Sequence, residues 1–318
     1  MKTNHLIVPM RRLLLAVVLT FSLAESKADD PNFASVQAAA EKGDAKAQYE
    51  LAICYAKGKG VPADAAKAAE YLRKAADQGY ANAQTAVGSC YGKGLGVPKN
   101  FSTAVEWYRK AAAQGDSLGQ YCLGACLLKG SGVATNADEG LGWWRKAAES
   151  GLPDAQCALG LHLMNRGYAD DTNHVNYVEA AQWLQKAADQ GYVPAMNNLG
   201  FLYKSGLGVK PNTTTALKWY RLGAEQDDPR AQANLGLAYE YGSGVRADIV
   251  EAYKWYLLSA QKLDTIGKHQ MEDFNVRRVL TTNQIAEARQ RANEFRASLR
   301  KAKGTATDQV SGSAPAER

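Results

Sequence analysis

The residue types in this chain that could do chemistry are cysteines, histidines and one serine–lysine pair. Three of its five cysteines, Cys54, Cys90 and Cys126, recur at intervals of 36 residues. Equivalent points on neighbouring packed helices lie ~8–10 Å apart, which exceeds the Cα separation of about 7 Å that a disulfide tolerates. We therefore interpret these three as small buried apolar groups. Of the remaining pairings, only Cys122 with Cys157 has a spacing that allows a bridge.

The sequence Ser298-Leu-Arg-Lys301 matches S-x-x-K, in which a serine acts as nucleophile beside a lysine, but no S-D-N or K-T-G accompanies it. We interpret the match as chance, with both side chains on the solvent face of a helix. Four histidines, one of them near the N-terminus, are too few to predict a metal site. His162 replaces a cysteine of earlier segments, which favours a half-buried structural role. We predict no catalytic residue, no metal and no cofactor.

A recurring unit of 36 residues, typified by residues 81–116, carries these side chains. A fixed period of this length indicates stacked supersecondary units. Its first half contains Val87-Gly88-x-x-Tyr91 or a relative, with spacings of three and four that place these side chains on one helical face. Gly-x-Gly-Val then ends the helix, because glycine accepts a positive φ. The copies begin at Ala45, Ala81, Ser117, Pro153, Val193 and Pro229, and the fourth is 40 residues long.

The second half of each unit predicts a second helix. Residues that cap helix N-termini stand at position 20: Asp64, Asn100, Asn136, Asn176, Asn212 and Asp248. An aromatic residue follows at position 27: Tyr71, Trp107, Trp143, Trp183, Trp219 and Trp255. Large aromatic residues facing alanines indicate a close-packed interface between paired helices. The chain is therefore predicted to be an all-α array of helix pairs.

The consensus A-x-A-Q-x-x-L-G-x-x-Y-x-x-G-x-G-V … A-x-x-W-x-x-K-A-A-x-x-G resembles the Sel-one-like repeat family, a branch of the tetratricopeptide-like superfamily. The resemblance implies a right-handed α/α solenoid of six repeats (45–80, 81–116, 117–152, 153–192, 193–228 and 229–264). It also implies an adaptor or scaffold role. Some members of the family carry a disulfide in each repeat, and this chain lacks that regular pairing. Others are linked to β-lactam binding or hydrolysis.

The ends of the chain depart from the repeat. A basic start and an apolar run, Leu13–Ala24, predict that residues 1–28 are a secretory signal, and the run is too short to span a bilayer. Residues 29–44 are predicted to form an N-terminal capping helix, residues 265–303 C-terminal capping helices, and residues 304–318 a disordered tail. The capping pair includes an amphipathic helix with its apolar face at Ile285, Ala288, Ala292, Phe295 and Leu299.

Charge excludes one class of partner. Removing residues 1–28, with four basic groups and one glutamate, lowers the net charge from +6 to +3. A mildly basic body gives no electrostatic basis for nucleic-acid binding. The sequence therefore predicts an exported protein, periplasmic or secreted, with no stable membrane insertion after signal cleavage.

Two features single out candidate surfaces. The fourth unit replaces Gly-x-Gly-Val with the longer stretch 166–175, which is either a partner loop or a tolerated insertion. Asn198 and Asn234 stand at position 6 of the fifth and sixth units, with Asn197 beside the first and Phe201 one turn on. In tetratricopeptide arrays this position lines the concave groove, where asparagine binds a peptide backbone. A solvated polar helix face is the alternative interpretation.

The function we expect is a non-catalytic exported scaffold that binds a protein or peptide on its concave face, through Asn197, Asn198, Phe201 and Asn234. A β-lactamase-like or other cell-wall hydrolase is the alternative from another class, and the sequence offers no convergent acid, base and nucleophile for it. A passive self-assembly module is the third possibility. The sequence leaves the oligomeric state open.

Overall fold

The computed structural model describes residues 33–169, 174–262, 268–269, 271–272 and 280–310, and within these ranges it contains helices joined by turns and no strand. The predicted all-α fold is confirmed. The described residues divide into two compact units, one before residue 166 and the other from residue 166 onward. The predicted signal segment lies outside the described residues, as does most of the first predicted C-terminal capping helix. Among the residues described, no helix is both long and apolar enough to cross a membrane.

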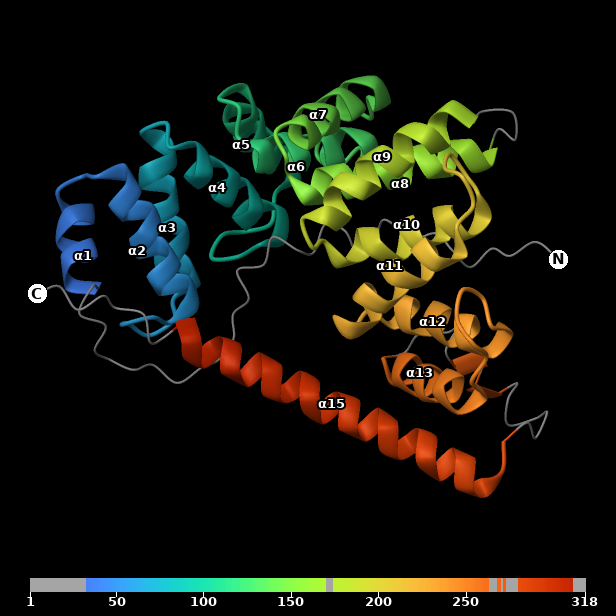
Figure 1. The fold of residues 1–318 in the computed structure, drawn as a ribbon. Helices are drawn as coiled ribbons and strands as arrows, with labels where there is room; N and C mark the ends of the chain where they lie inside the picture. The colour runs from blue at the N-terminus through green and yellow to red at the C-terminus, as the bar shows by residue number, and fades with distance from the viewer. Residues whose placement is uncertain (1–32, 170–173, 263–267, 270, 273–279, 311–318) are drawn as a thin grey trace, which may run out of the picture. The chain divides into compact units, whose positions relative to one another are not determined.

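The first unit is a series of antiparallel helix pairs preceded by a single helix (Figure 1). Its helices are α1 (Phe33–Glu41), α2 (Ala45–Lys57), α3 (Ala65–Asp77), α4 (Ala81–Lys93), α5 (Phe101–Ala113), α6 (Ser117–Lys129), α7 (Ala137–Glu149) and most of α8 (Pro153–Ala169). The lone α1 lies in the segment expected to cap the array. It packs on α2 in the place that the second helix of a preceding repeat would take.

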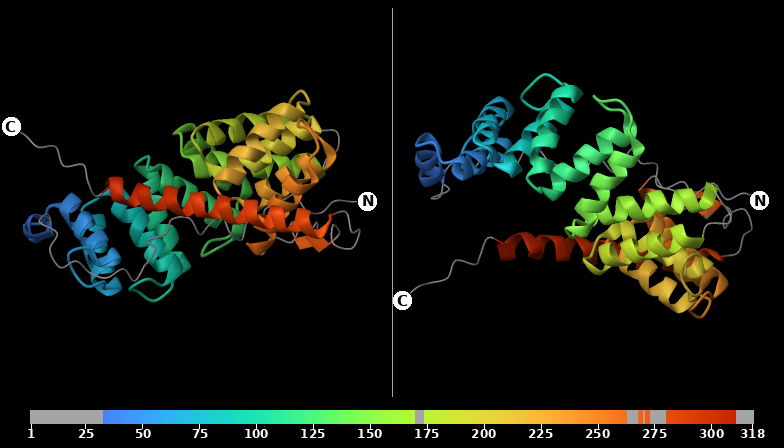
Figure 2. Two further views of the ribbon diagram at one scale, coloured as in Figure 1. Left: turned by 60° about the horizontal axis from the view of Figure 1, so that its bottom comes forward. Right: turned by 90° about the horizontal axis from the view of Figure 1, so that it is seen from above.

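The second unit continues the pairing and ends in one long helix. Its helices are α9 (His174–Asp189), α10 (Val193–Ser205), α11 (Thr213–Glu225), α12 (Pro229–Tyr241), α13 (Ile249–Gln261) and α15 (Thr282–Val310). Helix α15 packs against α13, and two further views show it continuing beyond α13 as a single rod (Figure 2).

Helix ends follow the caps that the repeat predicts, with one exception. Asn100 Oδ1 accepts the backbone N–H of Thr103 at 3.1 Å, and equivalent bonds occur at the other repeats. These caps are Asp64, Asn136, Asn212 and Asp248. The prediction for Asn176 is wrong, because α9 begins at His174 and places Asn176 inside the helix. First helices end at glycines such as Gly94, which adopts φ 75°.

The fourth repeat differs from the others because no Gly-x-Gly sequence ends its first helix. Helix α8 runs for 17 residues, against 13 in the first helices of the other repeats. The stretch 166–175 is therefore not one long loop: it supplies the end of α8 and the start of α9, and residues 170–173 between them lie outside the described residues. An insertion that lengthens two helices leaves the hydrogen bonding of both helices intact.

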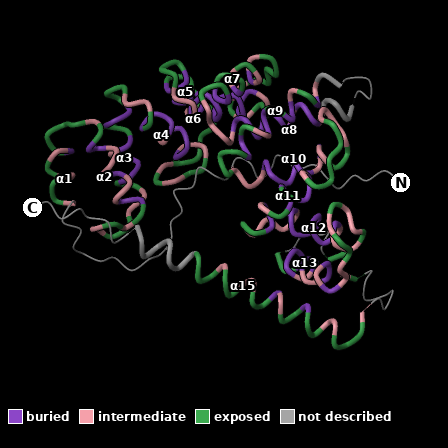
Figure 3. Tube along the Cα trace, in the orientation of Figure 1, coloured by how far each residue is buried: buried purple, intermediate pink, exposed green. Residues whose placement is uncertain are grey.

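Aromatic rings pack against glycines inside four of the helix pairs, at Gly88, Gly124, Gly200 and Gly236. Buried positions gather where paired helices face each other (Figure 3). A Cβ added at Gly88 would lie 2.6 Å from Cε1 of Tyr108, so only glycine admits this ring. At the equivalent positions the first repeat has Ala52, which is larger than glycine, and Leu72, which is smaller than tyrosine. The two positions thus compensate each other's volume, as close packing requires.

A ladder of buried glutamines joins successive repeats. Gln84 Nε2 donates to the carbonyl oxygen of Ala76 at the end of the preceding helix (3.2 Å), and its Oε1 accepts Gln114 Nε2 (2.8 Å). The hydrogen bond from the glutamine Nε2 to the end of the preceding helix recurs in four other repeats, at Gln48, Gln120, Gln156 and Gln232. Satisfying the last carbonyls of a buried helix end removes the cost of leaving them unpaired. The bond from Gln48 to Ala40 joins α1 to the array in the same way.

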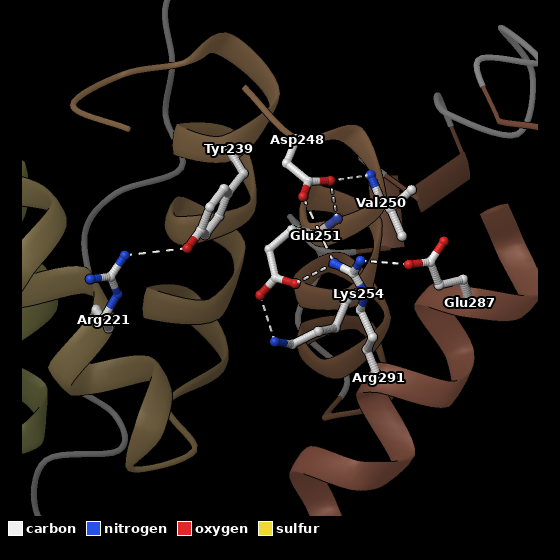
Figure 4. A network of polar contacts seen from close by, with 8 residues as sticks. All are labelled: Arg221, Tyr239, Asp248, Val250, Glu251, Lys254, Glu287 and Arg291. Atoms are coloured by element: carbon white, nitrogen blue, oxygen red, sulfur yellow. Dashed lines mark hydrogen bonds and ion pairs between the residues drawn. The ribbon is translucent and has the colours of Figure 1, made fainter. Parts of the chain in front are cut away.

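The closing helix is held by a capping box and an ionic network. Thr281 N donates to Gln284 Oε1 at 2.9 Å, and Gln284 N donates to Thr281 Oγ1 at 3.3 Å. Arg291 bridges Glu251 of α13 (3.1 Å) and Glu287 of its own helix (2.5 Å), while Lys254 pairs with Glu251 at 2.6 Å (Figure 4).

The apolar face of α15 packs as expected. Ala288 and Ala292 are buried, and Ile285, Phe295 and Leu299 are half-buried. The predicted end at residue 303 is wrong, because α15 continues to Val310. Once a helix is nucleated, each further residue adds a backbone hydrogen bond, so a polar stretch without proline extends it.

Candidate functional site

An open groove of about 450 Å³ crosses the first helices of the N-terminal unit. Helices α2 and α4 form most of it, and Leu118 of α6 with Leu152 and Asp154 at the start of α8 close one side. The contributing residues on α2 are Tyr49, Ile53 and Lys57, spaced by four and therefore on one helical face. The same positions of α4 carry Thr85, Ser89 and Lys93.

The groove has a mixed wall and a charged rim. Tyr49, Ile53, Ala86, Leu95, Leu118 and Leu152 are half-buried and present apolar surface. Lys57 and Lys93, each in the last turn of its helix, are exposed. Asp154 stands at the α8 wall. Apolar walls with a few placed polar groups are the usual composition of a binding pocket.

The polar side chains of the floor are bonded within the protein. Thr85 Oγ1 donates to Asp116 Oδ2 at 2.6 Å, and the same carboxylate caps α6 by accepting the N–H of Gly119 at 2.7 Å. Ser89 Oγ lies 3.3 Å from the hydroxyl of Tyr108. These bonds fix the floor, so an occupant would be recognised through the walls and the rim.

Two ionisable groups of the groove, the Cys90 thiol and the Tyr49 phenol, are neutral near pH 7. Burial raises the pKa of the Cys90 thiol to about 11. Burial, with Tyr80 and Asp116 close by, also raises the pKa of Tyr49. A thiol is a nucleophile only as thiolate, so the groove offers contacts rather than an activated nucleophile.

The predicted asparagines occupy buried positions on α10 and α12. Asn197, Asn198 and Asn234 are at most 8% exposed. The predicted pair was Asn198 with Asn234, but the structure brings Asn234 to Asn197, with its Nδ2 2.7 Å from Asn197 Oδ1. Asn198 donates instead to the carbonyl oxygen of Pro194 on its own helix. Phe201 is half-buried. Partner binding through these residues stays a prediction, and these internal bonds are ones that a peptide would have to replace.

Other residues singled out by type serve structural ends. No disulfide joins any of the five cysteines, each of which lies within the described residues, so Cys122 and Cys157 are not bridged. Ser298 is exposed, and its hydroxyl donates to the carbonyl oxygen of Phe295, while Lys301 is exposed. His162 is half-buried, as expected. Within the described ranges, no three side chains among His, Cys, Asp and Glu are grouped so that they could hold a metal ion.

The groove itself was missed at the sequence level. Its signal is the set of positions 5, 9 and 13 on the first helices of the first two repeats. These positions carry Tyr49, Ile53 and Lys57 in one repeat and Thr85, Ser89 and Lys93 in the next. Three residues spaced by four lie on one helical face, and the aligned repeats therefore show which side chains face the hollow.

Comparisons with known proteins agree with this architecture. A sequence profile described as Sel1 repeat matches residues 45–80, 81–116, 117–152, 153–192, 193–228 and 229–262. A Sel1 repeat protein from Oxalobacter formigenes is similar, at 30% identity and a TM-score of 0.65 over 80% of this chain and 96% of that one. No curated protein sequence matches.

A second solved structure is similar over a larger share of the chain. It is c5321, a protective antigen of uropathogenic Escherichia coli with an SLR fold. The two are 26% identical with a TM-score of 0.53, over 89% of this chain and 67% of that one. Six consecutive profile matches cover most of the sequence, and the helix pairs follow the same period. The chain belongs to the Sel1 repeat family.

Proposed function

We propose that the protein is a non-catalytic scaffold that binds a segment of another protein in the groove of α2, α4, α6 and α8. Sel1 repeats generally mediate protein–protein interaction. The observation that supports this site is the groove of about 450 Å³, to which four successive first helices contribute side chains. A surface shared by successive repeats suits an extended partner segment.

The composition of the groove sets the chemistry of the partner. Ile53, Leu118 and Leu152 offer apolar contacts, and Lys57 and Lys93 stand at the C-terminal ends of their helices. Side chains that suit this groove are an apolar anchor with a carboxylate beside it, since lysines pair with carboxylates. The best probe is therefore a peptide library rather than a single ligand.

The test is selection of a displayed random-peptide library on the purified full chain, followed by anisotropy measurements with the selected peptides. Ala86→Arg places a long side chain in the groove and should weaken binding at least tenfold. Ala113→Arg, at an exposed position at the end of α5, is the matched control and should leave affinity unchanged. Equal binding by both variants would place the site elsewhere, and Asn197, Asn198, Phe201 and Asn234 would be tested next.

We also propose that the protein acts outside the cytoplasm after removal of residues 1–28. The support is the basic start, the short apolar run and the small residues around Ala28. Mass spectrometry of the protein recovered from an exporting bacterial host should find a new N-terminus at Asp29. An intact Met1 in the exported fraction would contradict cleavage.

The hydrolase alternative has less support. Its motif residues, Ser298 and Lys301, lie on the exposed side of α15, and Ser298 is bonded to its own helix. Turnover of a chromogenic β-lactam that disappears in Ser298→Ala would revive it. Self-assembly is tested separately, because occupation of the groove by a second copy would make sedimentation depend on protein concentration and on Ala86→Arg.

A further inference from the structure

A second hollow, of about 270 Å³, lies in the C-terminal unit and carries an excess of positive charge. It is formed where the last turn of α13 and the middle of α15 meet the turn between α11 and α12. Three basic residues line it, Lys262, Arg296 and Arg300, with one carboxylate, Asp227, so the lining carries a net charge of +2. Leu258 and Leu299 supply apolar walls.

The single carboxylate of the hollow is already engaged. Asp227 is ion-paired with Lys262 and accepts a hydrogen bond from Gln232 Nε2 at 3.2 Å. Earlier repeats have glycine at this position, and Asp227 is the only non-glycine residue with positive φ (70°) in the part of the chain that the structure describes. The carboxylate neutralises Lys262, so the two arginines of α15 remain as the excess charge.

Arg296 is the residue of this hollow whose guanidinium is incompletely hydrogen-bonded. Its Nη2 is buried and meets no hydrogen-bond acceptor among the described residues. Its Nη1 reaches only Asn293 Oδ1, at 3.5 Å. A buried donor left unpaired is destabilising, and more so when it is charged. Arg300, one turn further along α15, is exposed at the same hollow.

We infer that this hollow binds an aliphatic carboxylate. A guanidinium holds a carboxylate through two parallel N–H···O bonds, which would supply the acceptor that Arg296 lacks. Leu258 and Leu299 suit a short hydrocarbon chain attached to that carboxylate. The volume lies just below the usual range of ligand pockets, roughly 300–1,000 Å³. The occupant is therefore a small molecule or the last residue of a partner chain.

Calorimetry with the purified full chain tests this inference. Isocaproate should bind, and isocaproamide, its neutral counterpart, should bind at least tenfold more weakly. Arg296→Gln should weaken isocaproate binding at least tenfold. Arg289→Gln, an exposed arginine on the same helix, is the matched control and should have no effect. Equal binding of acid and amide, no binding of either, or tighter binding of inorganic phosphate would overturn the assignment.

Two further measurements separate the source of the carboxylate and guard against a structural role for Arg296. A leucine-terminated peptide with a free C-terminus that binds where its amidated form does not supports the end of a partner chain. Isocaproate binding without peptide binding supports a small molecule. Arg296→Met should leave the melting temperature of the ligand-free protein unchanged or raised, because it removes the unpaired donor. A lower melting temperature would show that the guanidinium is structural and would overturn the proposal.

Discussion

The two units of this protein use the same helix pairs but hold them together with different polar contacts. In the first unit, Gln48 and Gln84 each accept an amide N–H from position 34 of their own repeat and donate to the helix before that repeat. In the fifth repeat Met196 replaces that glutamine, and its sulfur accepts the Nε2–H of Gln226 at 3.7 Å. Charged side chains, centred on Arg291 and Glu251, hold the closing helix to the end of the second unit.

The comparison shows that each glutamine needs a hydrogen-bond donor at position 34 of its own repeat. The glutamine of the third repeat, Gln120, has a buried Oε1 without a partner among the described residues, because Ser150 stands where Gln114 stands one repeat earlier. Gln232 has the same defect, because Lys262 pairs with Asp227 instead. The hydrogen bonds between neutral glutamines and carbonyl oxygens are insensitive to salt, whereas the solvent-accessible ion pairs of Arg291 weaken as ionic strength rises.

The largest expected effect tests whether the units are independent. Leu123 and Leu235 occupy the same repeat position, one in each unit, and both are fully buried. Leu123→Ala and Leu235→Ala should each cost about 2–5 kcal/mol. Because repeats contact mainly their neighbours, hydrogen exchange should quicken in the mutated unit only. Equal acceleration in both units would show one cooperative core.

A smaller effect depends on the cysteines, all of which lie in the first unit. Burial raises the pKa of Cys122 to about 12, whereas an unfolded thiol ionises near pH 8.5. Above that pH the unfolded state loses a proton that the folded state keeps, so stability falls as pH rises. Between pH 8.5 and 10 the parent should lose up to about 2 kcal/mol more than Cys122→Ala.

Urea unfolding at several pH values checks this expectation, and only the slope against pH is compared, since the substitution also changes stability at neutral pH. The window ends at pH 10 because tyrosines of the unfolded chain ionise above it. Parallel slopes for the parent and Cys122→Ala would mean that the folded thiol ionises as readily as the unfolded one.

The smallest expected effect repairs the ladder. Ser150→Gln supplies an amide near the unpaired Oε1 of Gln120, at the position from which Gln114 reaches Gln84. The added bond should stabilise the protein by about 0.5–1.5 kcal/mol. Thermal unfolding measures it, with Ser150→Gln in a Gln120→Leu background as the control, where the gain should vanish. A gain that persists there would come from helix propensity rather than from the added bond.

Much of the fold could be predicted from the sequence because the repeat supplies local signals in every copy. The caps at Asp64 and Asn100, and the capping box at Thr281, were readable because each depends only on residues a few positions apart. Asn176 failed because the insertion changed the start of its helix. The end of α15 failed because nothing local stops that helix before Val310.

The candidate sites were less predictable because they depend on how neighbouring helices are offset. Alignment pairs Asn198 with Asn234 at the same repeat position, but the packing of α10 on α12 pairs Asn197 with Asn234. Successive side chains on a helix point about 100° apart. A shift of one residue therefore decides which asparagine of α10 meets Asn234. The hollow at Arg296 requires residues from three elements, and no sequence period connects them.

The hydrogen bond between a glutamine and the end of the preceding helix also recurs with the period of the repeat, so one repeat can replace another at this contact. Gln84 meets the carbonyl oxygen of Ala76, and Gln120 meets that of Ala112, the same position one period later. Excision of residues 81–116 would therefore bring Gln120 to Ala76 with both bonding groups unchanged. A gene that loses or duplicates one 36-residue period keeps this hydrogen bond across the new junction, so the length of such an array, and of any surface along it, can change in whole steps during evolution.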